Sequence, residues 1–159
     1  MSKPSFVYVT YIASTPEKVF KALTSTEATE KYWFGHAVTS DWKVGSPVKF
    51  HREGKLTLGG QVLENDPPRR LSYTFTPYHE PHNGTDTSRV VMDLEQQRDQ
   101  VKLTVTHDDF APDSPVFASI SNGWPLVLSS LKSYLETNHV LWAPWYEDKA
   151  KQEAEKVAS

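Results

Sequence analysis

The chain has 159 residues, of which 38% are hydrophobic and 23% charged, so it is long enough for one domain with a substantial buried core. Its net charge is −3 and its seventeen basic residues form no stripe, which argues against nucleic acid as a partner. Cysteine is absent, which excludes disulfides, thiolate catalysis and cysteine-ligated metals.

The N-terminal part of the chain predicts one strand and two short helices. It lacks the apolar core of a signal peptide, and no run of 18 apolar residues occurs anywhere, so we expect a cytoplasmic protein without a membrane span. Residues 6–13 are β-branched and aromatic with alternating faces, which predicts a strand. Thr15 followed by Pro16 is typical of a helix N-terminus, and the apolar spacing predicts helices over residues 16–24 and 26–33.

The middle of the chain has the pattern of strands joined by short turns. Alternating apolar residues predict strands over residues 37–40, 46–52, 55–65, 71–76, 88–96 and 100–107. The pair Gly59-Gly60 predicts a bulge or kink in the third of these. Strands linked by hairpins, with helices only at the ends of the chain, predict an α+β fold with an antiparallel sheet.

The stretch from residue 114 to 138 predicts the one long helix. Its apolar side chains recur at three- and four-residue steps and form one stripe: Phe117, Ile120, Trp124, Leu128, Leu131 and Leu135. Ser114 and Pro115 suit the N-terminus of this helix. Pro125 predicts a bend beside Gly123 because it removes one backbone hydrogen bond.

The last twenty residues differ from the rest. Residues 140–146 are apolar and residues 147–159 are charged, so we expect a single domain over residues 1–139 followed by a tail over residues 140–159. The tail could pack against the domain and then fray. It could instead form a dimer contact or a lid over a cavity mouth.

Several short segments, in their order along the chain, carry a resemblance to a known family. These are residues 15–24 (TPEKVFKALT), 32–34 (YWF), 40–45 (SDWKVG), 64–71 (ENDPPRRL), 106–110 (THDDF) and 123–124 (GW). The set resembles the SRPBCC or START-like superfamily and, within it, the family of activators of heat shock protein 90 ATPase homologues. The resemblance implies a helix-grip fold, in which a curved antiparallel sheet of about six or seven strands wraps around a long C-terminal helix.

The resemblance also implies an elongated apolar cavity between the sheet and the C-terminal helix. The candidate lining residues are Trp33, Phe34, Phe50, Tyr73, Phe75, Met92, Leu103, Val105, His107, Trp124, Leu128 and Leu131. The same residues could instead form a close-packed core. Trp33 and Phe34 could gate the cavity mouth or simply seal the short helices onto the sheet.

His107 is the candidate with acid–base chemistry, because it follows Val105 on the inner face of a predicted strand. It could act as an acid or base, anchor a ligand hydroxyl, or be a hydrogen-bonded structural residue. Asp108, Asp109 and Glu64 could form a carboxylate pair or remain solvated. The segment from His79 to His82 has no visible third ligand, so we predict no metal site, and no motif indicates a cofactor or a catalytic apparatus.

Three functions remain open at this point. The first is binding of an apolar or aromatic small molecule, such as a lipid or polyketide-like compound, in the predicted cavity, with Tyr73, His107 or Trp124 orienting a polar atom. The second is a chaperone-associated interaction through the protein surface. Self-association through this surface is also open. The third is a cyclase- or hydrolase-type enzyme that uses His107. The resemblance specifies the fold better than the function, since its members bind lipids, polyketides and hormones, act as cyclases or assist chaperones.

Overall fold

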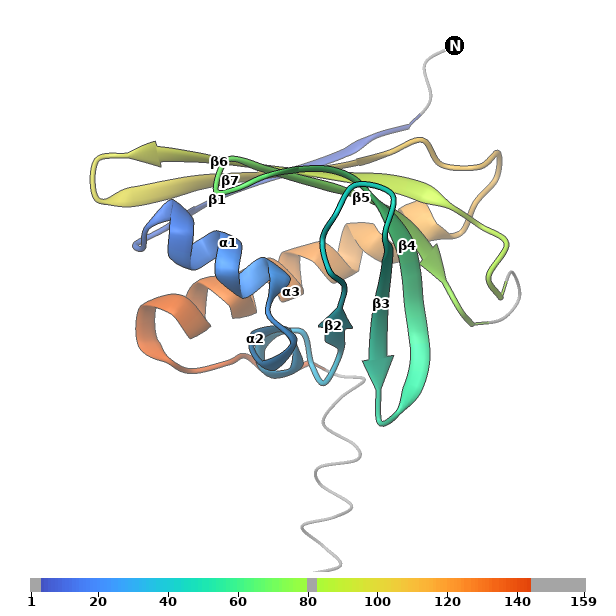
Figure 1. Cartoon of the computed structure of the whole chain (residues 1–159), viewed down its shortest axis with the longest axis horizontal. Helices are drawn as coiled ribbons and strands as arrows, with labels where there is room; N and C mark the ends of the chain where they lie inside the picture. The colour runs from blue at the N-terminus through green and yellow to red at the C-terminus, as the bar shows by residue number, and fades with distance from the viewer. Residues whose placement is uncertain (1–3, 80–82, 144–159) are drawn as a thin grey trace, which may run out of the picture.

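The computed structural model describes residues 4–79 and 83–143 and contains one curved, antiparallel seven-stranded sheet with three helices (Figure 1). The strands follow the order β1-β7-β6-β5-β4-β3-β2 across the sheet. Their bounds are β1 Phe6–Ile12, β2 Ala37–Thr39, β3 Pro47–Arg52, β4 Lys55–Asp66, β5 Arg70–Pro77, β6 Ser88–Gln97 and β7 Gln100–Asp108. The helices are α1 Pro16–Thr24, α2 Thr26–Tyr32 and α3 Val116–Thr137. This architecture confirms the predicted α+β helix-grip fold.

All three helices lie on the same side of the sheet, and α3 runs beneath it (Figure 1). The inward side chains of the strands alternate with outward ones, as in the fully alternating burial of β7 from Val101 to His107. Together with the helices they form one continuous core that includes Ile12, Val19, Leu71 and Leu131, each 0% exposed. The hydrophobic face of the sheet is therefore covered by helices, while its other face is turned to solvent.

The helix α3 carries the predicted apolar stripe. Ile120, Trp124, Leu128 and Leu131 are buried, while Phe117 and Leu135 pack against the core with partial exposure. The helix begins one residue later than predicted, because Pro115 is the N-cap and not the first helical residue; the Ser114 hydroxyl before it accepts a hydrogen bond from the Val116 N–H at 3.1 Å. The helix runs unbroken through Pro125 and ends at Asn138, which has the left-handed φ of 61° common at helix C-termini.

The two short helices begin with side-chain caps, and the second is tied to the sheet. Thr15 accepts a hydrogen bond from the Lys18 N–H, and Ser25 accepts one from the Ala28 N–H. In α2, the buried hydroxyl of Thr29 accepts a hydrogen bond from the Val38 N–H of β2 at 2.9 Å. The end of α2 is thereby held against the start of β2.

A tight turn between α2 and β2 brings two side chains beside α3. Phe34 and Gly35 both have positive φ, 51° and 89°, so the chain reverses direction within two residues. Trp33 and His36 flank this turn, and their rings line the same hollow as Ser119 and Ile120 of α3. The local backbone thus sets two aromatic rings at the edge of the core.

The pairing of β4 with β5 is irregular close to the predicted kink. No partner is assigned to Gly60 and Gln61, and the Gln61 N–H donates to the Thr74 hydroxyl at 2.8 Å, but the register shifts only further along, between Val62 and Glu64. A Cβ atom at Gly60 would lie 1.8 Å from the Thr74 carbonyl oxygen, so the close approach requires glycine. Figure 1 shows the β3–β4 hairpin extending away from β1, β6 and β7, towards the side of the sheet on which the helices lie.

The C-terminal tail is described only in part. The Leu141 N–H donates to the Ser130 hydroxyl of α3 at 3.2 Å, and Ala143 is 0% exposed. The backbone of Leu141 is therefore tied to α3 and Ala143 is buried, but the side chains of Val140, Leu141 and Trp142 are exposed. Residues 144–159, and with them the predicted charged run, lie outside the described residues. Within the described part of the chain, no helix combines the length and hydropathy needed to cross a membrane.

Candidate ligand-binding cleft

A cleft opens between the N-terminal half of α3, the β3–β4 hairpin and the end of β5. It consists of an outer hollow of about 530 Å³ and an inner hollow of about 170 Å³. The two hollows adjoin, because both are lined by Trp33, His36, Phe75, Ser119 and Ile120. The outer hollow has a volume within the range of small-molecule sites, and the inner one extends it along α3 to Gly123, Trp124 and Val127.

The two hollows differ in their linings. The inner hollow is completed by Gly123, Trp124 and Val127, which add an indole ring and aliphatic surface. The outer hollow is completed by Arg52, Thr57, Leu58, Pro77, Tyr78, His79, Pro115 and Val116. Among the described residues that line either hollow, no side chain is a carboxylate. The cleft is therefore mainly apolar in both hollows, and Arg52 adds a cation to the lining of the outer one.

Aromatic rings form the wall between the inner hollow and the core. The ring of Trp33 lies 5.2 Å from that of Trp124 in an edge-to-face arrangement and 4.8 Å from that of Phe50. The ring of Phe75 lies 6.3 Å from Trp124 and 4.7 Å from His107. Such pairs hold one another in place, because edge and face carry opposite partial charges. The inner end of the cleft therefore has a rigid aromatic wall.

His107 lies behind this wall, and both of its ring nitrogens are hydrogen-bonded. Its Nδ1 accepts a hydrogen bond from the Trp124 indole N–H at 3.0 Å, and its Nε2 lies 2.6 Å from the Ser88 hydroxyl. An indole N–H can only donate, so Nδ1 carries no proton and the neutral ring must carry it on Nε2. Nε2 then donates to Ser88, whose own hydroxyl donates to the Phe75 carbonyl at 3.4 Å. The chain of donors and acceptors is complete.

The environment of His107 keeps the ring neutral. Burial lowers the pKa of His107 to about 3, although neighbouring Asp108 acts in the opposite direction. Neither nitrogen has a lone pair or proton available to a molecule in the cleft. Ser88 receives a hydrogen bond from His107 rather than giving up its proton to it, so the pair does not form an activated nucleophile. The geometry favours the structural role of His107 over acid–base catalysis.

His36, in contrast, has a hydrogen bond at one of its two ring nitrogens among the described residues. Its Nδ1 lies 3.2 Å from the Trp33 carbonyl oxygen, which can only accept, so Nδ1 carries the proton and Nε2 has a lone pair. Burial, followed by the charge of Arg52, lowers the pKa of His36 to about 4. His36 thus lines both hollows as a neutral ring with a hydrogen-bond acceptor.

Three of the twelve residues predicted to line a cavity line this cleft: Trp33, Phe75 and Trp124. The other nine are at most 2% exposed and belong to the core: Phe34, Phe50, Tyr73, Met92, Leu103, Val105, His107, Leu128 and Leu131. Of these, Phe50, Tyr73, Met92 and Leu128 fill the space between the sheet and the middle of α3. The cleft occupies only one end of the gap that the sequence predicts to be hollow.

Sequence reasoning missed several residues of the cleft. His36 and Arg52 belong to no spacing motif, and Gly123 carries no side chain. The one local signal is the Phe34-Gly35 pair, whose glycine permits the turn that exposes His36 to the cleft. Among the described residues no cluster of histidine and carboxylate side chains could hold a metal ion, and Glu80 to His82 of the predicted weak candidate lie outside them.

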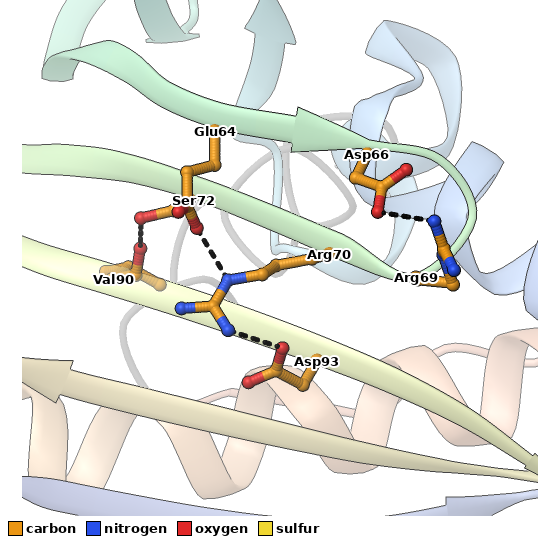
Figure 2. A network of polar contacts seen from close by, with 7 residues as sticks. All are labelled: Glu64, Asp66, Arg69, Arg70, Ser72, Val90 and Asp93. Atoms are coloured by element: carbon orange, nitrogen blue, oxygen red, sulfur yellow. Dashed lines mark hydrogen bonds and ion pairs between the residues drawn. The ribbon is translucent and has the colours of Figure 1, made fainter.

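The opposite face of the sheet carries two shallow polar depressions of about 450 and 440 Å³. Figure 2 shows part of their lining: Arg70 lies between Glu64 and Asp93, and the Ser72 hydroxyl donates to the Val90 carbonyl. Arg89 binds both carboxylate oxygens of Asp108 at 2.9 Å. Glu64 and Asp108 are thus paired with arginines and do not form a carboxylate pair. Exposed ion pairs of this kind stabilise by at most about 1 kcal/mol and leave little unsatisfied polarity for a ligand.

Comparisons with solved structures agree on the fold. The Aha1 dimer from Colwellia psychrerythraea has 22% identity and a TM-score of 0.69, over 84% of this chain and 97% of that chain. A protein from Mesorhizobium loti has 24% identity and a TM-score of 0.72, again over 84% of this chain and 97% of its own. An HSP90 activator from Plasmodium falciparum has 21% identity and a TM-score of 0.63, over 76% of this chain and 86% of that chain.

The similar structures show the fold, whereas a match to a family model shows the family of the chain. None of the curated proteins matches the sequence. Residues 13–136, from the end of β1 almost to the end of α3, match the model described as Activator of Hsp90 ATPase homolog 1-like protein. Because this match spans well over half of the chain and agrees with the observed fold, the chain belongs to the family of Activator of Hsp90 ATPase homolog 1-like proteins.

Proposed function

We propose that this protein binds an apolar or aromatic small molecule in the cleft. The observation that carries the proposal is the pair of adjoining hollows, about 530 and 170 Å³, that lead past Trp33 and Phe75 to the ring of Trp124. Burying ligand carbon against these walls would contribute about 25 cal/mol per Å² of apolar surface. The open outer end, beside Arg52, would keep part of the ligand in contact with solvent.

The proposed site lies at one end of α3 rather than along its whole length. The middle of the sheet is closed by packed side chains such as Met92 and Leu128, each 1% exposed. The cleft instead lies beside the β3–β4 hairpin, whose residues Arg52, Thr57 and Leu58 line it. A ligand would lie between this hairpin and α3, with one end beside Trp124.

Gly123 offers a direct test of the inner hollow. It lies in α3, lines the inner hollow, and a Cβ added there would have no heavy atom within 4 Å. We expect Gly123→Phe to fill the inner hollow and to weaken binding of the dye 1-anilinonaphthalene-8-sulfonate at least tenfold, as measured by fluorescence titration. Tenfold corresponds to about 1.4 kcal/mol of binding free energy.

The matched control is Gly123→Ala, which adds one methyl group at the same position. Alanine is favoured over glycine within a helix by about 0.5–1 kcal/mol, so this variant should be slightly more stable and should bind the dye with nearly unchanged affinity. If Gly123→Phe binds as well as the wild-type protein while its circular dichroism is unchanged, the inner hollow is not the binding site. If the wild-type protein binds neither the dye nor any member of a lipid and polyphenol panel, the proposed function is wrong.

A second candidate function is assistance of an Hsp90-type chaperone. It is supported by the family description and by the similar fold of the HSP90 activator from Plasmodium falciparum. Such an interaction would use the outer surface, so the ATPase rate of the chaperone should respond equally to the wild-type protein and to Gly123→Phe. No stimulation and no complex in a pull-down would contradict this candidate.

Self-association is a third possible interaction. A similar structure is that of a dimer, from Colwellia psychrerythraea, and the edge strand β1 of this chain exposes Val7, Val9 and Tyr11 on one face. An apolar edge strand can pair with a second strand. Light scattering of the purified protein would give its mass in solution, and a monomer at all concentrations would exclude this interaction.

A further inference from the structure

The inner hollow contains few polar groups that a ligand could reach. Its lining has two indole N–H groups, the Ser119 hydroxyl and the ring of His36. The indole N–H of Trp124 is already donated to His107, and Ser119 is exposed at the surface of α3. His36 is half-buried and makes one hydrogen bond, through Nδ1, within the part of the chain that the structure describes. Its Nε2 lone pair is therefore the acceptor that a bound molecule would meet.

The protonation state of His36 keeps this acceptor available. Burial disfavours the protonated ring, and the neighbouring charge of Arg52 adds to this, so the pKa of His36 is lowered to about 4. At pH 6–8 the ring is neutral. Since the Trp33 carbonyl holds the proton on Nδ1, the tautomer with Nε2 as acceptor persists in the free protein.

The walls around His36 define the rest of the ligand. The rings of Trp33, Phe75 and Trp124 line the inner hollow, and ring–ring contacts favour a flat aromatic guest. A volume of about 170 Å³ holds one or two fused rings at the inner end. No described lining residue is a carboxylate, and the permanent charge of Arg52 is positive, so a cationic ligand is disfavoured.

We infer that the ligand is an aromatic molecule bearing a hydroxyl group, and that His36 accepts a hydrogen bond from this hydroxyl through Nε2. This inference rests on the proposed binding in the cleft and names the chemical class of the ligand. His36 thereby acts as a specificity-determining residue, because a site with a buried acceptor discriminates against an analogue that has no donor.

The test uses 2-naphthol and 2-methylnaphthalene, which differ in a hydroxyl and a methyl group of similar size. Calorimetric titration gives the dissociation constant of each probe for the wild-type protein and for His36→Asn. The amide N–H of asparagine can take the place of Nδ1 and donate to the Trp33 carbonyl, whereas no acceptor remains at the position of Nε2. We expect His36→Asn to weaken the binding of 2-naphthol about fivefold to tenfold and the binding of 2-methylnaphthalene less than twofold.

The matched variant is His36→Gln, whose longer side chain can place a carbonyl oxygen near the position of Nε2. It should recover most of the affinity for 2-naphthol, which a purely structural role of His36 would not explain. A measurement on the wild-type protein needs no folded variant: the ¹⁵N resonance of His36 Nε2 should move upfield on addition of 2-naphthol and stay in place with 2-methylnaphthalene.

The outcomes separate the two proposals. If His36→Asn weakens the binding of both probes equally, or if the Nε2 resonance does not respond to 2-naphthol, the inference about His36 is wrong while binding in the cleft stands. If the wild-type protein binds neither probe, the proposed function fails, and the inference fails with it. A loss of affinity for 2-naphthol alone in His36→Asn supports both the inference about His36 and the proposed binding in the cleft.

Discussion

Replacing Trp124 with alanine is expected to lower the free energy of unfolding by about 3–5 kcal/mol, the usual loss for a large buried aromatic side chain. Trp124 is 3% exposed, and its ring touches those of Trp33, Phe75 and His107 at centroid distances of 5.2 to 6.3 Å. Alanine would leave a void between the cleft and the core. It would also leave the Nδ1 acceptor of His107 without its donor. Urea unfolding followed by circular dichroism measures the change.

Trp124→Phe separates the two causes of this loss. Phenylalanine retains an aromatic ring in the same place but has no N–H, so the unsatisfied acceptor on His107 becomes the main defect. We expect a loss of about 1–3 kcal/mol, clearly smaller than that of Trp124→Ala. A loss below about 1 kcal/mol in Trp124→Ala would contradict the close packing that the ring distances indicate.

Acidification between pH 6.5 and pH 5 is the second change expected to have a large effect. The pKa values of His107 and His36 are lowered from 6.5 to about 3 and about 4, in each case chiefly by burial. In this range the unfolded chain binds protons at both residues and the folded protein does not, so stability is fully present above pH 6.5 and falls as the pH decreases. Each histidine contributes up to about 1.4 kcal/mol per pH unit, and we expect a total loss of about 2–4 kcal/mol by pH 5.

Two carboxylates with lowered pKa values affect the stability of the protein only below pH 5. Hydrogen bonds from the Ser46 side chain and the Lys43 N–H lower the pKa of Asp41, and those from the Ala13 N–H and Lys132 lower that of Glu136. Their contributions are lost below about pH 4.5. Chemical unfolding at half-unit steps from pH 7.5 to 5 therefore reports mainly on the histidines.

His107→Phe is the control for the acid response. It removes the titrating group at similar volume but leaves the donor of Trp124 unpaired, so the variant should be less stable at pH 7 and lose less stability between pH 6.5 and pH 5. If the wild-type protein is equally stable at pH 6.5 and pH 5, the neutral, buried state assigned to His107 is wrong.

Local patterns predicted most of the fold. The alternation of Leu71, Tyr73 and Phe75 indicated β5, and the spacing of Ile120, Trp124 and Leu128 indicated the buried face of α3. Both follow from backbone geometry, because the period of a strand or helix decides which side chains share a face. The resemblance of short segments, together with this order of elements, also predicted the family.

The position of the cleft did not follow from such patterns. Periodicity shows that Phe50, Tyr73 and Trp124 point inward, but not how far the helix lies from the sheet. In the structure Phe50 and Tyr73 are buried in the core, and the cleft lies beside the β3–β4 hairpin. Its lining comes from α3, from this hairpin and from the end of β5, which only the tertiary fold brings together.

The amino-acid sequence alone therefore determined the strands, the helices and their buried faces, since each depends on neighbours within a few residues. Only the tertiary structure decided the chemistry of the two central histidines. His107 becomes neutral and fully hydrogen-bonded because Trp124 and Ser88, distant in sequence, meet it in the core. His36 keeps a lone pair beside the cleft because a turn directs its Nδ1 to the Trp33 carbonyl, while Ser119 and Ile120 of α3 line the same hollow. Burial and hydrogen-bond partners set the chemistry of a histidine, and both arise from contacts that sequence spacing does not encode.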